Sequence, residues 1–354
     1  MAKETSNSRV AWEHIVREKD KVGDAYYKTS DSVAEELHND MVGKTAFVNL
    51  LFITLTKHPV IITGVTSGSL GADAARVIAA HEPKLLILAS RSEAAIAKTI
   101  EEIKPTASAG TRIEPLIIDL SDQLSVRAAA KKVLELTPVV DVLINSAALM
   151  MIHKYTTNAG GVEMHLAINH LGHFLFTNLI MSALLKSDGP GRVVNISAAA
   201  HRIGPFRFDD YNFGEGEAYD PTLGYAQSKC ANLLFTLSLA QKLGHEKLLS
   251  YGVDPGGSIT NLFHRAPKEE MLKHGWLLEN GDPSPALLGG LKSVQQSVAS
   301  YIVAAYSPEI KDRNGCTITG GIVDDTVAEH AKDPEAAEQL WNLSEKLVGQ
   351  KFNY

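Results

Sequence analysis

The sequence VIITGVTSGSLG, residues 60–71, decides the expected fold of this chain. A short apolar run over 60–63 leads into a glycine loop, and an alanine-rich helical pattern follows over 72–79. Strand, glycine loop and helix in this order form a dinucleotide-binding unit, because the glycines let the backbone approach a pyrophosphate and the helix N-terminus offers free N–H groups. The alternative for the loop alone is an ordinary glycine-rich turn.

Further apolar runs alternate with helical patterns along the rest of the chain. The apolar runs cover residues 85–89, 113–118, 139–144, 192–197 and 247–253. The helical patterns cover residues 92–103, 123–136, 161–185, 222–243, 285–306 and 334–348. The apolar runs lack polar alternation, so helices are expected on both faces of a parallel sheet. We predict an α/β fold with one doubly wound parallel sheet, a Rossmann fold, in a single domain.

Ligands of such sheets bind beyond the carboxyl ends of the strands, where the glycine loop, Asp119 and Asn145 are expected. Arg91 follows the second strand, at the place where the adenosine ribose lies in this fold. An arginine there accommodates the 2′-phosphate of NADP, whereas an acid reads the 2′-hydroxyl of NAD. Arg91 therefore favours NADP(H), with a solvated loop arginine as an equal alternative for this residue alone.

The expected organisation centres on one nucleotide-binding domain over residues 44–325. Residues 1–43 form a polar extension with weak helical patterns, one of which has capping-box spacing at Ser32, and we expect it to be loosely attached. Residues 46–59 look like an unusual insertion ahead of the first strand. Residues 198–221 and 261–285 are expected to be substrate loops, and residues 326–354 a C-terminal helix packed on the domain.

Composition narrows the class of protein further. The net charge of −7 over 354 residues provides no basic surface for nucleic acid or anionic membranes. The polar N-terminus lacks an apolar signal core, and the apolar segment 46–55 is too short to span a bilayer. Two cysteines fit a reducing compartment, so we expect a cytoplasmic protein. The 13 histidines show no convincing metal-ligand spacing, so no metal is expected.

Tyr225 and Lys229 stand four residues apart in the helical pattern 222–243, which places them on one face of a helix. A tyrosine hydroxyl titrates near pH ~10, and an adjacent ammonium favours the phenolate. A tyrosine tuned in this way exchanges a proton with a carbonyl or alcohol oxygen. The spacing alone is common by chance, and an ordinary exposed Tyr and Lys is then the better interpretation.

Several motifs together change that judgement. They are NHLGHF at 169–174, RVVNIS at 192–197, AH at 200–201, YAQSKCAN at 225–232 and AAYSPE at 304–309. In these blocks the chain, from about residue 44 to its C-terminus, resembles the short-chain dehydrogenase/reductase superfamily. It is most similar to the branch that contains the retinol dehydrogenases and the WW-domain oxidoreductases.

The resemblance implies a role for each site residue. Tyr225 would be the general acid/base, Lys229 would lower its pKa and bind the nicotinamide ribose, and Asn169 would hold a water in the proton path. Ser197 is the remaining catalytic candidate, but the family's substrate-polarising serine aligns with the next residue, so Ser197 would have to swing in or that hydrogen bond is missing. The implied cofactor-binding residues are Gly64, Ser67, Gly68, Leu70, Gly71, Arg91, Asp119, Leu120, Asn145, Tyr225, Lys229, Pro255 and Thr260.

Three positions depart from the family pattern. Ser69 and Leu70 both separate Gly68 from Gly71, one residue more than usual. Ala198 stands where the branch has a second serine that polarises the substrate oxygen. The turn at 145–148 reads NSAA and lacks its usual final glycine.

The resulting hypothesis is an NADP(H)-dependent oxidoreductase, with NAD(H) less favoured. Its substrate would be a ketone, aldehyde or alcohol of a hydrophobic small molecule. The resemblance also implies a homodimer or homotetramer formed through the Asn169 and Tyr225 helices. The alternative hypothesis is an impaired NADP(H)-binding sensor or scaffold, motivated by Ala198 and the altered glycine loop.

Overall fold

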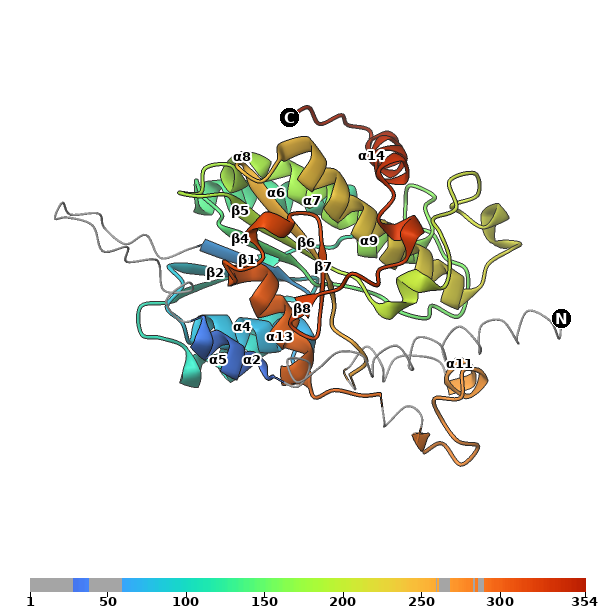
Figure 1. Ribbon diagram of the computed structural model, residues 1–354, viewed down its shortest axis with the longest axis horizontal. Helices are drawn as coiled ribbons and strands as arrows, with labels where there is room; N and C mark the ends of the chain where they lie inside the picture. Colours follow the sequence, from blue (N-terminus) through green and yellow to red (C-terminus); the bar gives the residue numbers. More distant parts are fainter. Residues whose placement is uncertain (1–27, 38–58, 259, 261–267, 283, 286–289) are drawn as a thin grey trace.

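The computed structural model describes residues 28–37, 59–258, 260, 268–282, 284–285 and 290–354 (Figure 1). An eight-stranded sheet runs through its centre in the order β3-β2-β1-β4-β5-β6-β7-β8. The strands are β1 (Pro59–Thr63), β2 (Leu85–Ser90), β3 (Arg112–Ile117), β4 (Val142–Asn145), β5 (Gly191–Ile196), β6 (Leu248–Asp254), β7 (Thr317–Thr319) and β8 (Ile322–Val323).

Strands β1 to β7 pair in parallel, and only the short β8 pairs antiparallel with β7. The strand order reverses between β1 and β4, because β2 and β3 lie on one side of β1 and all later strands on the other. The prediction of a doubly wound parallel sheet is therefore confirmed. The six expected strands are present, and the short β7 and β8 were not expected.

Helices cover both faces of the sheet (Figure 1). On one face, apolar side chains pack from α2 (Ser30–Glu36), α4 (Leu70–Ala79), α5 (Glu93–Ile103) and α13 (Val294–Tyr306). On the other face lie α6 (Gln123–Leu136), the π-helix η4 (Leu166–Gly172), α7 (His173–Leu179), α8 (Met181–Leu184), α9 (Pro221–Leu243) and α14 (Pro334–Val348). The strands β1, β2, β4, β5 and β6 are thus buried on both faces, which explains why they lack polar alternation, whereas the edge strand β3 is largely exposed.

The described part of the N-terminal extension is docked on the domain. Helix α2 begins after the cap Thr29, rather than Ser32, and buries Val33 and Ala34. Its Asp31 pairs with Arg76 of α4 at 2.8 Å. The expectation of a loosely attached extension is therefore wrong for residues 28–37. The insertion at 46–59 lies outside the described residues except for Pro59, which begins β1.

Two predicted helices differ in extent. The expected helix over 161–185 is divided into η4, α7 and α8, and it starts late because the Glu163 carboxylate accepts the N–H groups of His165 and Leu166. Of the helix expected over 285–306, α13 is described from Val294, where Ser293 and Gln296 form a capping box, and residues 286–289 lie outside the described part of the chain. The loop expected at 261–285 contains the short helix α11 (Lys268–Lys273).

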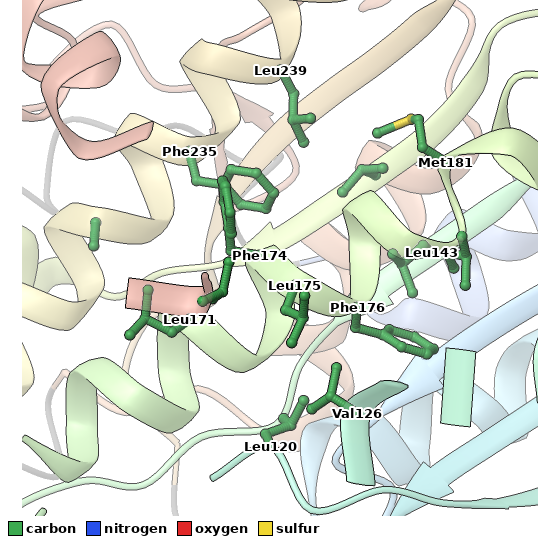
Figure 2. Close-up of a cluster of buried hydrophobic side chains, with 14 of the residues drawn as sticks. Leu120, Val126, Leu143, Leu171, Phe174, Leu175, Phe176, Met181, Phe235 and Leu239 are labelled. Atoms are coloured by element: carbon green, nitrogen blue, oxygen red, sulfur yellow. The ribbon is translucent and has the colours of Figure 1, made fainter. Parts of the chain in front are cut away.

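The C-terminal helix α14 packs on α9 and η4. Trp341 is buried against Phe174 at a ring-centroid distance of 5.0 Å, and Ser238 of α9 donates to the Ala337 carbonyl at 2.8 Å. Figure 2 shows Phe174 of α7 beside Phe235 of α9 in the same cluster of buried side chains. The chain's own last helix therefore covers part of the helix pair through which dimerisation was expected.

Within the described residues, every helix is too short or too polar to cross a bilayer.

Candidate active site

The glycine loop connects β1 to α4 at the carboxyl edge of the sheet. Gly64 and Gly68 adopt positive φ angles of 76° and 75°, a region that favours glycine. A Cβ on Gly64 would lie 2.6 Å from the Ala147 Cα, so only glycine fits beneath the turn after β4. The loop therefore has the conformation and the close packing that a nucleotide-binding turn requires.

The additional residue in the loop forms a helix cap. The Ser69 hydroxyl accepts the Ala72 N–H at 3.1 Å and donates to the Gly64 carbonyl at 2.8 Å, so α4 begins at Leu70. The backbone accommodates the longer loop without a break in α4, although the serine takes one of the free N–H groups of the helix. The Ser67 hydroxyl donates instead to Glu102 of α5 at 2.8 Å.

Arg91 and Asp119 follow β2 and β3 at the same edge. The Arg91 side chain is exposed, and within the described part of the chain it has no ion-pair or hydrogen-bond partner. The Asp119 carboxylate accepts the N–H and the hydroxyl of Ser121 at 2.9 and 2.7 Å. The Leu120 backbone packs directly against Gly172 of η4, which explains the glycine in that motif.

The turn after β4 is held by Thr63 rather than by Asn145. The Thr63 hydroxyl accepts the N–H groups of Ser146 and Ala147 at 2.9 and 3.0 Å. The side-chain NH2 of Asn145 donates to the Thr177 hydroxyl and to the side-chain oxygen of Asn195. Asn145 thus anchors the end of β4, while Thr63, a polar residue at the end of a buried strand, orders the turn.

Tyr225 and Lys229 lie on one face of α9, as their spacing predicts. The Lys229 Nζ lies 5.6 Å from the centroid of the Tyr225 ring and donates to the Ile196 carbonyl at the end of β5 at 2.9 Å. Helix α9 starts at the cap Asp220, whose carboxylate accepts two N–H groups. Both side chains are almost fully buried, with exposed fractions of 7% and 2%.

Burial dominates the electrostatics of this pair. It lowers the pKa of Lys229 to about 7, against the opposing effect of the Asp254 carboxylate. Burial, followed by the charge of Asp254, raises the pKa of the Tyr225 hydroxyl above its ordinary value. In the protein alone, the expected lowering of the tyrosine pKa by Lys229 is therefore outweighed.

Asn169 lies in the π-helix η4, a helix type that is frequent at functional sites. Its side-chain amide exchanges hydrogen bonds with the Leu149 backbone at 2.8 and 2.9 Å. It also donates to Ser228 of α9 at 2.9 Å, and Ser228 donates to the Tyr225 carbonyl. Asn169 is thus joined to the helix that carries Tyr225 and Lys229.

The serine after β5 points away from the tyrosine. The Ser197 hydroxyl is buried and donates to the Lys229 carbonyl at 2.8 Å. Ala198 packs instead in the small apolar cluster around Tyr225, which also includes Met150 and Ile203. The side chain that this strand end contributes to the cluster around Tyr225 is therefore a methyl group.

Met150 and Met151 were not predicted from the sequence, whereas Met271, Trp276 and Leu277, which pack with them, lie in the loop 261–285 that was expected to shape the substrate site. Met150 contacts both the Tyr225 cluster and a second cluster formed by Met151, Met271, Trp276 and Leu277. Met151 has a φ of 54°, a strained value for a residue with a side chain.

The residue after Met151 is clamped from two sides. The Ile152 N–H donates to His165 Nε2 at 3.2 Å, and Tyr219 donates to the Ile152 carbonyl at 2.7 Å. The positions of His165 and Tyr219 depend on contacts across the chain, so no local pattern indicated them.

Pro255 follows β6 and is buried, next to Asp254, whose carboxylate accepts the Gly256 N–H at 2.9 Å. Thr260 is partly buried and lies beside residues outside the described part of the chain.

Comparison with known proteins agrees with this geometry. The model of the short chain dehydrogenase family matches residues 58–213. The chain is 35% identical over 301 residues to the short-chain dehydrogenase/reductase prx1 of Penicillium rubens, covering 81% of this chain and 84% of that protein. It is 31% identical over 300 residues to human retinol dehydrogenase 14, covering 82% of this chain and 86% of the relative.

A crystal structure of an uncharacterized protein from Mycobacterium paratuberculosis is 30% identical and matches with a TM-score of 0.61, covering 85% of this chain and 97% of the other. A short-chain dehydrogenase from Escherichia coli, solved in complex with NADPH, has the same fold at 20% identity and a TM-score of 0.57, covering 75% of this chain and 98% of the other. With the strand–glycine loop–helix unit and the Tyr225–Lys229 pair in place, these likenesses show that the chain belongs to the short-chain dehydrogenase/reductase family, in the branch of the retinol dehydrogenases.

Proposed function

We propose that this oxidoreductase is an NADP(H)-dependent enzyme that interconverts a carbonyl and an alcohol on a hydrophobic small molecule. The observation that carries the proposal is the convergence of Tyr225, Lys229 and Asn169 at the carboxyl edge of the sheet, beside the glycine loop. Bound there, the nicotinamide would supply or accept the hydride.

The residues present fit such a cofactor. The loop between Gly64 and Gly71 offers close backbone approach at the N-terminus of α4, and the Arg91 guanidinium is exposed after β2. An anionic ligand near Lys229 would favour its charged form, which in turn favours loss of the Tyr225 proton. The assignment to NADP(H) rather than NAD(H) rests on Arg91.

In the proposed reaction, Tyr225 gives its proton to the carbonyl oxygen during reduction, or takes it from the alcohol during oxidation. The positive charge of Lys229 stabilises Tyr225 when it has lost its proton. Asn169 fixes the position of η4 relative to α9. Met150, Ala198 and Ile203 form an apolar surrounding that favours a hydrophobic substrate and excludes water from the reacting oxygen.

Replacement of Tyr225 by Phe tests the proposal. We expect Y225F to abolish NADPH-dependent reduction of a panel of aldehydes and ketones while the variant still binds NADPH in calorimetric titration. The matched control is Y251F, which removes another buried hydroxyl, bonded to the Ile310 carbonyl, on β6. Turnover by Y225F at the wild-type rate would refute the assignment of the acid/base, and absence of NADPH and NADH binding by the wild type would refute the nucleotide site.

A second candidate function, an impaired NADP(H)-binding sensor or scaffold, is favoured by Ala198. Loss of one substrate-polarising donor costs ~10²–10³ in rate at comparable sites. The hydroxyl of Ser197 already donates to the Lys229 carbonyl, so it is a poor replacement. If A198S gains that factor over both the wild type and the neighbouring A199S control, the native enzyme is impaired. If A198S gains nothing while the wild type is active, the substrate oxygen needs no second donor.

A further inference from the structure

His173 is a buried histidine that joins two parts of the site, and its side chain is 2% exposed. Its Nδ1 lies 3.1 Å from the Asn169 carbonyl oxygen, one helical turn earlier. Its Nε2 lies 2.9 Å from the hydroxyl of Thr63, the last residue of β1 and 110 residues away in the sequence. Both ring nitrogens are therefore used by groups of the site.

These contacts determine where the proton on the ring lies. A carbonyl oxygen only accepts, so Nδ1 carries the proton and donates to Asn169. Burial lowers the pKa of His173 to about 4, so the ring is neutral at pH 7 and Nε2 is an acceptor. The Thr63 oxygen already accepts two N–H groups, and its own proton is directed to Nε2 at 2.9 Å rather than to the Ile144 carbonyl oxygen, which lies farther away at 3.5 Å.

At one end of this chain of hydrogen bonds, Thr63 contacts the part of the site where the nucleotide is proposed to bind. Thr63 holds the N–H groups of Ser146 and Ala147, and this turn lies on Gly64 at the start of the glycine loop. A shift of the turn would therefore change the surface on which the loop rests.

The Asn169 end reaches the acid/base side. The side chain of Asn169 is held by the Leu149 backbone and by Ser228, which is bonded to the Tyr225 carbonyl. His173 contributes the link from Asn169 back to the strand that bears the glycine loop.

We propose that His173 is a positioning residue, which couples the turn beneath the nucleotide to Asn169 and the Tyr225 helix through one neutral imidazole. The inference rests on the proposed function, since it assigns His173 a place in the same oxidoreductase site. A side chain that is hydrogen-bonded at both ends fixes the position of the hydride donor relative to the proton donor. A displacement of about 1 Å between these two groups can cost about 10²-fold in rate.

His170 provides a matched control. It is equally buried, on the same helical segment, and burial lowers its pKa to about 3. Its Nε2 bonds to Ser344 of α14, and its ring packs against Phe174 and Phe235. Loss of His170 therefore removes a buried imidazole whose hydrogen bond and ring contacts go to Ser344, Phe174 and Phe235 rather than to Thr63 or the Asn169 carbonyl.

The experiment compares H173L with H170L, and adds T63V, T63S and the double variant T63V/H173L. We expect the kcat/KM of H173L for a carbonyl substrate to fall about 10²-fold, and that of H170L to fall less than a few-fold. The comparison requires that circular dichroism shows both variants to be folded to the same extent. T63S, which keeps the hydroxyl, should retain the rate, and T63V/H173L should be no slower than T63V, because both changes break one chain of bonds.

Two measurements without turnover accompany the kinetics. Nitrogen-15 NMR of labelled histidine in the wild type should show protonated Nδ1 and unprotonated Nε2 for His173. Hydrogen exchange at the Ser146 and Ala147 amides should be faster in H173L than in H170L. If the wild type neither binds NADPH nor turns over, the proposed function fails, and these two measurements still decide the placement of His173.

Equal kinetics of H173L and H170L in an active enzyme would overturn the proposal. So would additive effects of T63V and H173L, the opposite tautomer, or unchanged exchange at residues 146 and 147.

Discussion

Lys229 is expected to make the stability of the protein depend on pH. In the folded chain, burial lowers its pKa to about 7, whereas an unfolded lysine titrates at ~10.4. Below about pH 7 both states carry the proton, and the folded state bears the whole cost of burying the charge. As the pH rises from about 7 towards about 10, the folded state gives up the proton while the unfolded state keeps it, so the free energy of unfolding increases.

The magnitude follows from the size of the shift. A difference of about three pKa units corresponds to about 4 kcal/mol in total, of which roughly 2–3 kcal/mol is recovered between about pH 6 and about pH 9. K229M has a side chain of similar length and no charge, so it removes this dependence. We expect the free energy of unfolding of the wild type, minus that of K229M, to rise by roughly 2–3 kcal/mol over that range.

The assay is urea unfolding, followed by circular dichroism, at several pH values for the wild type, K229M and K242M. K242M removes a lysine from the same helix, at a surface ion pair with Glu338, where such pairs contribute ~0–1 kcal/mol. If K229M fails to fold, the carbon-13 shift of the Lys229 Cε in the wild type reports the titration directly. Parallel pH curves for the wild type and K229M, or a Cε titration near pH ~10, would refute the argument that burial dominates at this lysine.

Three further predictions address the loop, the packing and the assembly. S69A should lower the free energy of unfolding by ~1 kcal/mol, because it removes the α4 cap. It should also weaken NADPH binding in calorimetric titration. An unchanged affinity would show that the loop does not need the cap. G172A should destabilise by ~1–3 kcal/mol, because a Cβ there would lie 2.4 Å from the Leu120 carbonyl oxygen; G189A, with no atom within 4 Å of the new Cβ, is the control in the same unfolding assay. Deletion of residues 334–354 should expose the apolar surface of α9, so that the truncated protein self-associates and its sedimentation coefficient increases. Sedimentation of the truncated protein as a single chain would contradict the covering role of α14.

Local sequence determined the class of the fold and most of its elements. Apolar runs such as 60–63 and 85–89 can only be buried on both sides, and a glycine loop between a strand and a helix has few other conformations. The placement of Tyr225 and Lys229 on one face followed from helical geometry alone. These features depend on residues close together in the chain, so a pattern of spacing is enough to predict them.

Tertiary structure decided what each side chain does at the site. The direction of the Ser197 hydroxyl depends on its hydrogen bond to the Lys229 carbonyl of α9. The docking of α2 depends on α4 and α13. The extra loop residue became a helix cap because the Ser69 hydroxyl reaches the Gly64 carbonyl. Thr63 and His173 meet only because β1 and α7 pack together. Hydrogen bonds between residues far apart in the chain leave no local periodicity, and the balance of burial against charge at Lys229 depends on the layer that surrounds it. For that reason the sequence by itself determined the strand–loop–helix frame and the candidate residues, while the tertiary structure alone decided their partners and their protonation.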